Sequence, residues 1–510
     1  MGAYSWFTEE DEGKVQPAAE KEWGSPIPCR QVSTGEFMPL PQTPKQKEYE
    51  ARTKALADEL AKKHGLDRRQ FLRTASGFAA AFVTMNEVYG NIFTVNPAEA
   101  ADPEVAKARQ VALKNQFIFD DQTHHVSDNY QWEGVLFLRD FAAGNNPMKK
   151  PLNPALIGKA PKMSDYKFEA YLKDMFLDSD TTVSLLSGFT SDATEKEPLT
   201  NDQITQSRDM VNKLAGTRRM FAHGLFAPGR PGYLEEMERA ATVLKVDSWK
   251  GYTVGDPLGP SRLPWRLDDE KLAYPAYRIA EKHGIRNICI HKGLIPADYK
   301  SFKNWQFANV DDLGKAAQDW PQLNFIIYHA ALRPGFDYLE AEKEFESTGK
   351  IPWVDDLAEI RGKYGVDNVY PEIGSAFGTT VITHPRLAAG MLGRLIKGCG
   401  YDHICWGTDS VWYGSPQWQI EAFRRLEIPD DMRKKHGFEL LGAETGKVKS
   451  TILGYTNARL YGLSLMADGT PLERYDRDGI ARVKAPYREM GGLPDNIRYG
   501  CVRRDDNVSA

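Results

Sequence analysis

The sequence lacks several features that mark common classes of protein. It has 510 residues with a formal net charge of −5 and no basic face, which argues against a nucleic-acid partner. No apolar run reaches the roughly 18 residues that a membrane span requires. With 41% hydrophobic and 26% charged residues, the chain is typical of a globular protein with one large or two medium domains.

Cysteine is also scarce, with five residues in the whole chain. No C-x-x-C pair is present and no spacing resembles a disulfide framework, so a cysteine-based metal site is excluded. Cys289 and Cys405 lie inside apolar, strand-like segments, and we predict that both are buried free thiols. A G-x-G-x-x-G loop after an early strand is absent too, which disfavours an open dinucleotide-binding sheet.

The first hundred residues differ from the rest of the chain. After a polar stretch, Arg68 and Arg69 precede a mildly apolar run over 75–83, and Ala98-Glu99-Ala100 resembles a small-residue cleavage site. This order is typical of a twin-arginine export signal. We predict that residues 1–100 are a leader and that the protein is periplasmic; if the segment is only an amphipathic N-terminal helix, the protein is cytoplasmic.

From residue 116 onward, short apolar runs alternate with segments of helical periodicity. The predicted strands are 116–123, 183–189, 218–226, 248–254, 287–293, 324–332, 368–375 and 403–410. Strand–helix alternation implies parallel strands, and eight such units favour closure into a (β/α)₈ barrel of the TIM type.

The barrel is predicted to cover residues 101–465. A long insertion over 126–182 follows the first strand, and connections of this length usually form lids or partner surfaces. Here it forms either a cap over the barrel mouth or a small satellite core. Residues 466–510 form a C-terminal extension that wraps the barrel or a neighbouring subunit, and we expect a homodimer.

Four residues with metal or proton chemistry end four of the predicted strands: His125, His291, His329 and Asp409. In such barrels the catalytic groups come from the C-terminal ends of the strands. Asp409 alone could equally be a helix N-cap, but a buried carboxylate among imidazoles suits a divalent ion. We predict one ion, Zn²⁺ first with Mn²⁺ or Fe²⁺ as alternatives, held by His125, His291 and Asp409, with His329 and Asp409 as catalytic groups.

Five segments together resemble the amidohydrolase superfamily: FDDQTHHV, ICIHKG, FIIYHAAL, CWGTDS and TILGYTNARLYGL. The similarity is to its amidohydrolase-related branch, which includes aminocarboxymuconate-semialdehyde decarboxylase, and it covers roughly residues 115–465. The resemblance implies a metal-dependent enzyme on a (β/α)₈ barrel. It matches His125 to the second histidine of the first strand, His291 to a ligand, His329 to a catalytic histidine and Asp409 to the last aspartate.

The first strand departs from the D-x-H-x-H pattern of that superfamily. Aligning His125 puts Thr123, a poor metal ligand, at the first ligand position. Strict side-chain alternation places Thr123 and His125 on one face of the strand and His124 on the other. We therefore predict that His125 is the ligand and His124 a neighbouring contact. Water, Asp121 or a loop group completes the coordination, or the site holds a different metal or none.

Lys250 and Glu372 are further candidates for substrate or supporting contacts. Some members of the superfamily bridge two metals with a carboxylated lysine from the fourth strand, but we favour a Lys250 paired with an acid inside the barrel. Glu372 reaches the end of the seventh strand, where it could donate a proton or contact substrate.

We predict a metal-dependent hydrolase in which metal-activated water attacks an amide, lactone or related C–N or C–O bond of a small molecule. The second hypothesis is a non-oxidative decarboxylase or hydro-lyase on the same barrel. The third is a binding protein that has lost catalysis, for which Thr123 is the best support.

Overall fold

The structure, a computed structural model, describes residues 26–27, 42–132, 136, 163–257, 259–294, 302–333, 338–412, 414–466 and 471–489. Most of the first 41 residues, most of the predicted insertion and residues 490–510 lie outside this part. Within it, no helix combines the length and the apolar character needed to cross a membrane.

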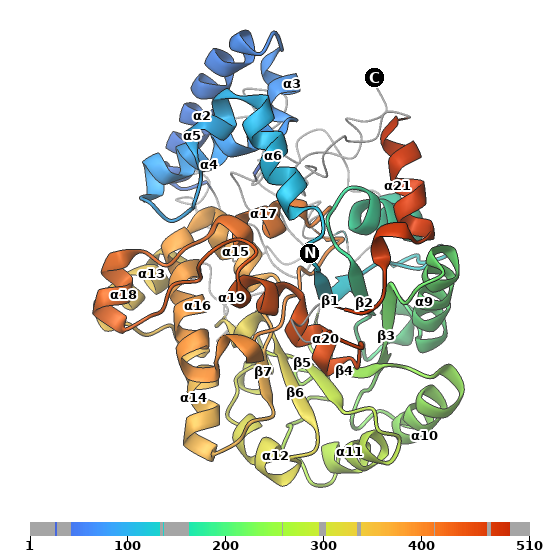
Figure 1. The fold of residues 1–510 in the computed structure, drawn as a ribbon. Coiled ribbons are helices and arrows are strands. Elements are labelled where there is room, and N and C mark those ends of the chain that lie inside the picture. Colours follow the sequence, from blue (N-terminus) through green and yellow to red (C-terminus); the bar gives the residue numbers. More distant parts are fainter. Residues whose placement is uncertain are drawn as a thin grey trace, which may run out of the picture.

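Seven parallel strands form one sheet in the order of the sequence (Figure 1). They are β1 (Phe119–His124), β2 (Val183–Ser187), β3 (Met220–Leu225), β4 (Ser248–Tyr252), β5 (Asn287–His291), β6 (Asn324–Tyr328) and β7 (Val369–Pro371). Each lies on a predicted segment, although β1 starts later and continues through His124. Parallel pairing of successive strands is what strand–helix alternation requires.

The predicted eighth strand, 403–410, closes the ring through isolated bridges. Glu372 bridges Cys405 on one side, and Thr123 bridges Ser410 on the other, both in parallel. Backbone hydrogen bonds of 2.6–3.3 Å run along both seams. The segment leaves the extended conformation at Asp409, where φ is 60°, so its pairing is interrupted. The predicted (β/α)₈ barrel is therefore confirmed, with an irregular last strand.

Apolar side chains fill the lower interior of the barrel. Phe119 packs against Phe221 with ring centroids 5.1 Å apart, and Cys289 and Cys405 join the same cluster. Both thiols are free and buried, as predicted. Because this layer is apolar and buried, the polar residues above it at the strand ends lie in a low-dielectric environment.

Helices cover the outside of the barrel (Figure 1). They are α8 (Phe168–Leu172), α9 (Asn201–Ala215), α10 (Tyr233–Arg239), α11 (Ala273–Lys282), α12 (Leu313–Asp319), α13 (Tyr338–Thr348), α14 (Val354–Tyr364), α15 (Ala376–Thr383), α16 (Pro385–Cys399), α17 (Gln417–Arg425), α18 (Asp430–His436), α19 (Lys447–Ser450), α20 (Thr456–Leu460) and α21 (Gly479–Glu489). Their apolar residues recur at helical spacing; in α11, Ala273, Ala276, Tyr277 and Ala280 are all buried.

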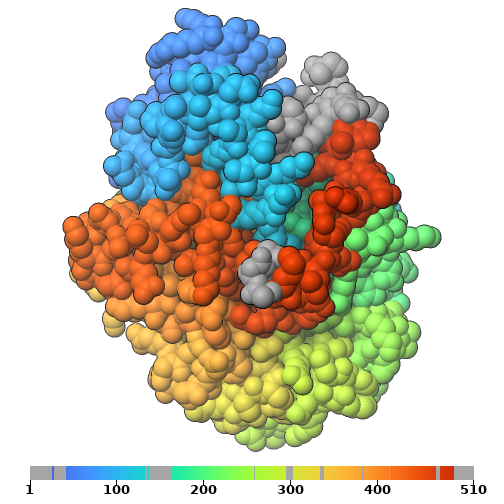
Figure 2. Space-filling view, viewed as in Figure 1, coloured from blue at the N-terminus to red at the C-terminus, as the bar shows by residue number. Residues whose placement is uncertain are grey.

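The described part of the predicted leader is folded. It forms α2 (Pro44–Lys63), α3 (Arg68–Leu72), α4 (Ala75–Tyr89), α5 (Pro97–Ala101) and α6 (Pro103–Leu113). These blue helices lie directly against the orange segments late in the chain (Figure 2). The apolar run over 75–83 lies in α4, whose Phe78 and Phe82 share one hydrophobic cluster with Trp406 and Phe423 of the barrel.

The described part of the C-terminal extension contacts the barrel. Helix α21 lies against α9, and Asp478 at its start forms an ion pair with Arg219 next to β3. Near the other end of the helix, the Tyr487 hydroxyl donates to Asp178 over 2.7 Å. The extension thus wraps its own barrel over residues 471–489.

Alanine substitutions at two glycines, one in α14 and one in α16, should change stability in opposite directions. A Cβ at Gly398 would lie 2.2 Å from the Ala358 carbonyl oxygen, whereas one at Gly362 would meet no atom within 4 Å. We expect Gly398→Ala to lower the free energy of unfolding by about 1–3 kcal/mol through overpacking. Gly362→Ala should raise it by up to about 1 kcal/mol through helix propensity. Denaturant unfolding measures both, and an unchanged midpoint for Gly398→Ala would contradict the packing.

Candidate active site

The barrel mouth brings together four of the polar residues singled out by the sequence. His124 ends β1, His291 ends β5, His329 follows β6 and Asp409 lies in the closing segment. Each side chain is at most 1% exposed. The charge of Asp409 acts on both His291 and His329, so these groups share one electrostatic environment.

A bulge in β1 decides which histidine faces this group. Asp120 pairs with Ser184 but Thr123 pairs with Leu186, so a step of three residues in β1 matches a step of two in β2. The extra residue shifts the alternation of side chains. His124 consequently points into the mouth, and the structure does not bring His125, the predicted ligand, to this group.

His125 lies outside the group, with both ring nitrogens engaged. Its Nδ1 is 3.0 Å from the Val126 carbonyl oxygen, and its Nε2 is 3.0 Å from the Ser207 hydroxyl. The ring packs against Phe168 and Tyr171. Burial lowers its pKa to about 4. These contacts give His125 a role in packing the connection after β1.

Thr123 is likewise turned away from the mouth. Its hydroxyl donates to the Leu185 carbonyl oxygen over 2.8 Å and lies 2.9 Å from the Tyr171 hydroxyl. Gln122 instead faces inward, with its Nε2 3.4 Å from His329 Nε2. The inward pair on this strand is therefore Gln122 and His124, not Thr123 and His125.

A backbone carbonyl fixes one ring nitrogen of each inward histidine. The contacts are His124 Nδ1 with Ser187 at 3.1 Å, His291 Nε2 with Leu294 at 2.7 Å and His329 Nδ1 with Gly374 at 2.8 Å. Because a carbonyl oxygen only accepts hydrogen bonds, these nitrogens carry the proton. In a neutral ring the other nitrogen is then an acceptor.

The remaining ring nitrogens face other acceptors. His124 Nε2 lies 3.0 Å from Asp409 Oδ1, and His291 Nδ1 lies 3.1 Å from His329 Nε2. Burial lowers the pKa of His291 well below its usual value and that of His329 to about 4, so both rings are neutral at pH 7. The facing nitrogens of His291 and His329 repel each other unless a proton or a cation lies between them. The mouth thus has a surplus of acceptors.

Asp409 supplies the negative charge. Burial opposes its ionisation, but its contacts with His124 and Ser375 outweigh burial and lower its pKa well below the usual range. Ser375 donates its hydroxyl proton to Asp409 Oδ2. The backbone φ angles of His329, Ser375 and Asp409 are 61°, 51° and 60°. Such left-handed conformations cost about 1–3 kcal/mol each and cluster at functional sites.

Charged residues lie beneath this group inside the barrel. Lys250 Nζ is 3.6 Å from the centroid of the Tyr328 ring, and its charge acts on Asp121 and Glu372. Burial raises the pKa of Asp121 well above its usual value. The structure therefore places Lys250 among acids inside the barrel.

Glu372 lies next to the inward histidines. Its carboxyl accepts hydrogen bonds from the backbone N–H of His329, at 3.1 Å, and of Gly374. Burial raises its pKa to about 8, so the group is protonated at neutral pH. A protonated carboxyl at this position is a potential acid.

Sequence reasoning missed several contributors to the site. Trp412 stacks on His124 with ring centroids 5.5 Å apart, and Tyr252 stacks on His291 at 5.0 Å. Ser375 and the inward role of Gln122 were missed as well. Trp412 lies three residues after Asp409 and could have been suspected from that spacing, whereas Gln122 depends on the bulge.

The donor set suits a divalent cation in its chemistry. Imidazole nitrogens and a carboxylate are the ligands that Zn²⁺ and related ions take. As the side chains stand, no three His, Cys, Asp or Glu residues in the described part of the chain form a ready-made metal site. His124, His291 and Asp409 are the residues that would hold such an ion, which would supply a positive charge beside the Asp409 carboxylate.

Several solved structures are similar to this chain at low sequence identity. The chain is similar to an uncharacterised TIM-barrel protein from Bordetella bronchiseptica, with 14% identity and a TM-score of 0.44 over 68% of this chain and 98% of that one. It is also similar to a 5-carboxyvanillate decarboxylase from Sphingomonas paucimobilis, with 16% identity and a TM-score of 0.37 over 69% and 100% of the two chains.

A further similar structure is a 5-carboxyvanillate decarboxylase from Novosphingobium aromaticivorans with bound manganese, at 12% identity and a TM-score of 0.40, covering 69% and 98% of the two chains. A search of curated proteins found no match. The family pattern described as amidohydrolase matches residues 124–463, about two thirds of the chain. The protein belongs to the amidohydrolase family.

Proposed function

We propose that the protein is a metal-dependent enzyme that hydrolyses an amide, lactone or related C–N or C–O bond of a small molecule. The surplus of acceptors in the barrel mouth carries this proposal. Metal-binding histidines commonly donate their second ring N–H to a carbonyl, and all three inward histidines do so here.

The ligands in this proposal are His124, His291 and Asp409. His124 takes the place predicted for His125, because the bulge in β1 turns His124 inward. A bound Zn²⁺, Mn²⁺ or Fe²⁺ ion would supply Lewis-acid polarisation and activation of water.

His329 holds or moves the proton. Its Nδ1–H is fixed by the Gly374 carbonyl, so Nε2 is the atom that accepts a proton from an attacking water and returns it to the leaving group. Its low pKa keeps that nitrogen free of a proton at pH 7. Gln122 Nε2, 3.4 Å away, orients the ring from the β1 side.

Glu372 favours a second candidate function, non-oxidative decarboxylation. Its pKa of about 8 keeps a proton on a carboxyl that lies next to His329, and replacement of a carboxylate on carbon needs such a proton donor. A panel of amides, lactones and aromatic acids separates the two reactions: hydrolysis products support the first, and carbon dioxide release with no hydrolysis supports the second.

Metal binding distinguishes the two adjacent histidines. We expect His124→Ala to reduce affinity for Zn²⁺ or Mn²⁺ by about 10–100-fold or more, because it removes a ligand. His125→Ala is the matched control and should retain the ion, since that ring faces Ser207. Metal content after dialysis, measured by mass spectrometry, decides between them. Equal retention in both variants would contradict the assignment of His124.

Proton transfer distinguishes His329 from the ligands. We expect His329→Asn to lower turnover by about 10²–10⁴-fold while the protein retains its metal, because the base is lost and the proposed ligands stay. The assay uses the substrate found in the panel, with metal content measured on the same sample. Full turnover in this variant would rule out His329 as the base.

A further inference from the structure

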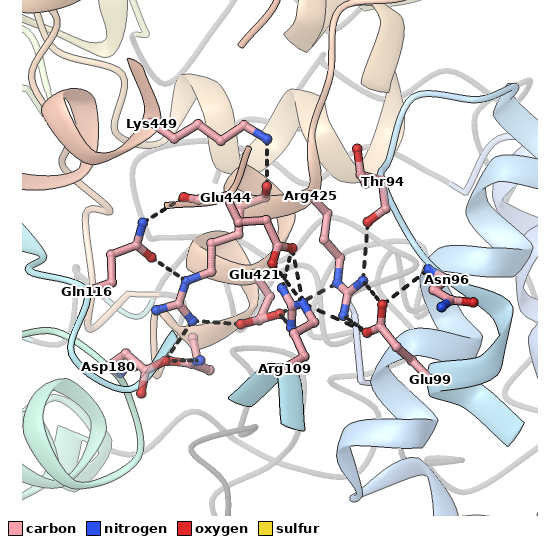
Figure 3. Close-up of polar contacts among 12 residues, drawn as sticks. Thr94, Asn96, Glu99, Arg109, Gln116, Asp180, Glu421, Arg425, Glu444 and Lys449 are labelled. Carbon is pink, nitrogen blue, oxygen red and sulfur yellow. Dashed lines mark hydrogen bonds and ion pairs between the residues drawn. The ribbon is translucent and has the colours of Figure 1, made fainter. Parts of the chain in front are cut away.

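The segment that resembles an export signal is tied to the barrel by buried charges. Arg425 of α17 pairs with Glu99 over 2.7 Å, and the two side chains are 2% and 9% exposed. Glu99 is the central residue of the Ala98-Glu99-Ala100 stretch and lies within α5. Figure 3 shows this pair beside Thr94, whose carbonyl also accepts from Arg425.

Two further ion pairs, both of Arg109, continue the same network. Arg109 of α6 binds Glu421 of α17 at 2.8 Å and Glu444 at 2.7 Å (Figure 3). Burial alone would raise the pKa of Glu421, but the charges of Arg109, Arg424 and Arg425 lower it to about 2. Glu421 is therefore ionised at working pH and attracts all three cations.

Backbone pairing and apolar packing join the same two parts of the chain. Phe93 forms an antiparallel bridge with Leu426, and the Thr94 N–H donates to the Arg425 carbonyl over 2.6 Å. Phe82 of α4 packs on Phe93 with centroids 4.9 Å apart and lies 5.2 Å from the Arg425 guanidinium. The apolar face of the supposed signal is thus occupied by the barrel.

Helix α17, which these contacts hold, lies next to the segment that carries Asp409. In α17, Gln419 Nε2 donates to the Thr408 carbonyl over 3.1 Å, one residue before Asp409. Arg424 of the same helix pairs with Asp180, just before β2. The ionic network therefore connects the N-terminal helices to the segment that carries Asp409.

We propose that residues 42–100 are a permanent clamp on α17 rather than a removable leader. Cleavage after Ala100 would remove Glu99 and leave the buried Arg425 without that partner, which is a strongly destabilising change. It would also uncover the apolar surface that α4 covers. Ala100 itself is 3% exposed and lies within helix α5 in the folded chain.

A specific nick in the full-length protein tests the clamp. A protease recognition sequence is inserted between Ala101 and Asp102, both exposed, and cut after folding. We expect residues 1–101 to elute with the remaining chain in size-exclusion chromatography at pH 7. Separation followed by aggregation of the remainder also supports the clamp, whereas a remainder that stays monodisperse with the Tm of uncut protein overturns it.

Substitution of the buried pair gives a second, independent readout. We expect Glu99→Gln to lower Tm by about 5 °C or more. Glu87→Gln is the matched control, because its pair with Arg52 is about half exposed, and its Tm should change by about 1 °C or less. Equal shifts in the two variants would count against the clamp.

A third test expresses the full-length chain in a bacterium with twin-arginine export. The intact mass of the folded protein then shows which N-terminal residues it retains. Retention of residues 42–100 in the folded fraction agrees with the clamp. A folded periplasmic product that begins at residue 101 would restore the export prediction and refute the clamp.

Discussion

Three carbonyl oxygens determine the chemistry of the barrel mouth. By accepting from one nitrogen of His124, His291 and His329, they fix each buried ring in one tautomer and turn its second nitrogen toward another acceptor. Burial keeps His291 and His329 neutral, so these rings do not relieve the repulsion by protonation. Asp409 adds a full negative charge. A divalent cation is the simplest partner for such a set, and the proposed metal-dependent function rests on this argument.

The surrounding fold holds this arrangement in place. The closing segment pairs with both β7 and β1, which completes the ring and carries Asp409 to the mouth. Helix α17 lies behind that segment and is bound to the N-terminal helices through Glu99, Arg109, Glu421 and Arg425. The N-terminal helices are therefore connected to the site through α17, whose Gln419 donates to the carbonyl of Thr408, the residue before Asp409.

The sequence predicted the barrel well because each strand is an apolar run bounded by helical periodicity, and parallel order follows from alternation alone. It also predicted that His291, His329 and Asp409 lie at one mouth, because the strand ends in such barrels meet there, and their roles stay predictions. Strict alternation placed His125 inward and His124 outward, which is not the arrangement in the structure. A bulge between Asp120 and Thr123 changes which side chains face inward, and an alternating pattern does not predict such an extra residue.

For the N-terminal segment, the sequence and the fold point in different directions, and the export prediction stays a prediction. Arg68, Arg69 and the apolar run over 75–83 have the composition of an export signal, yet the same apolar residues form the buried face of α4. Composition does not distinguish a helix that binds a translocase from one that packs on its own domain. Glu99 is the informative residue, because its partner Arg425 lies more than three hundred positions away and is found only in the folded chain.

The most direct test of the central claim is anomalous diffraction from crystals of the protein grown with Zn²⁺ or Mn²⁺. The account predicts one strong anomalous peak within bonding distance of His124 Nε2, His291 Nδ1 and an Asp409 oxygen, with His125 away from the ion. A peak bound to His125, or a mouth in which protonated histidines pair with Asp409 and no ion binds at saturating metal, would contradict it.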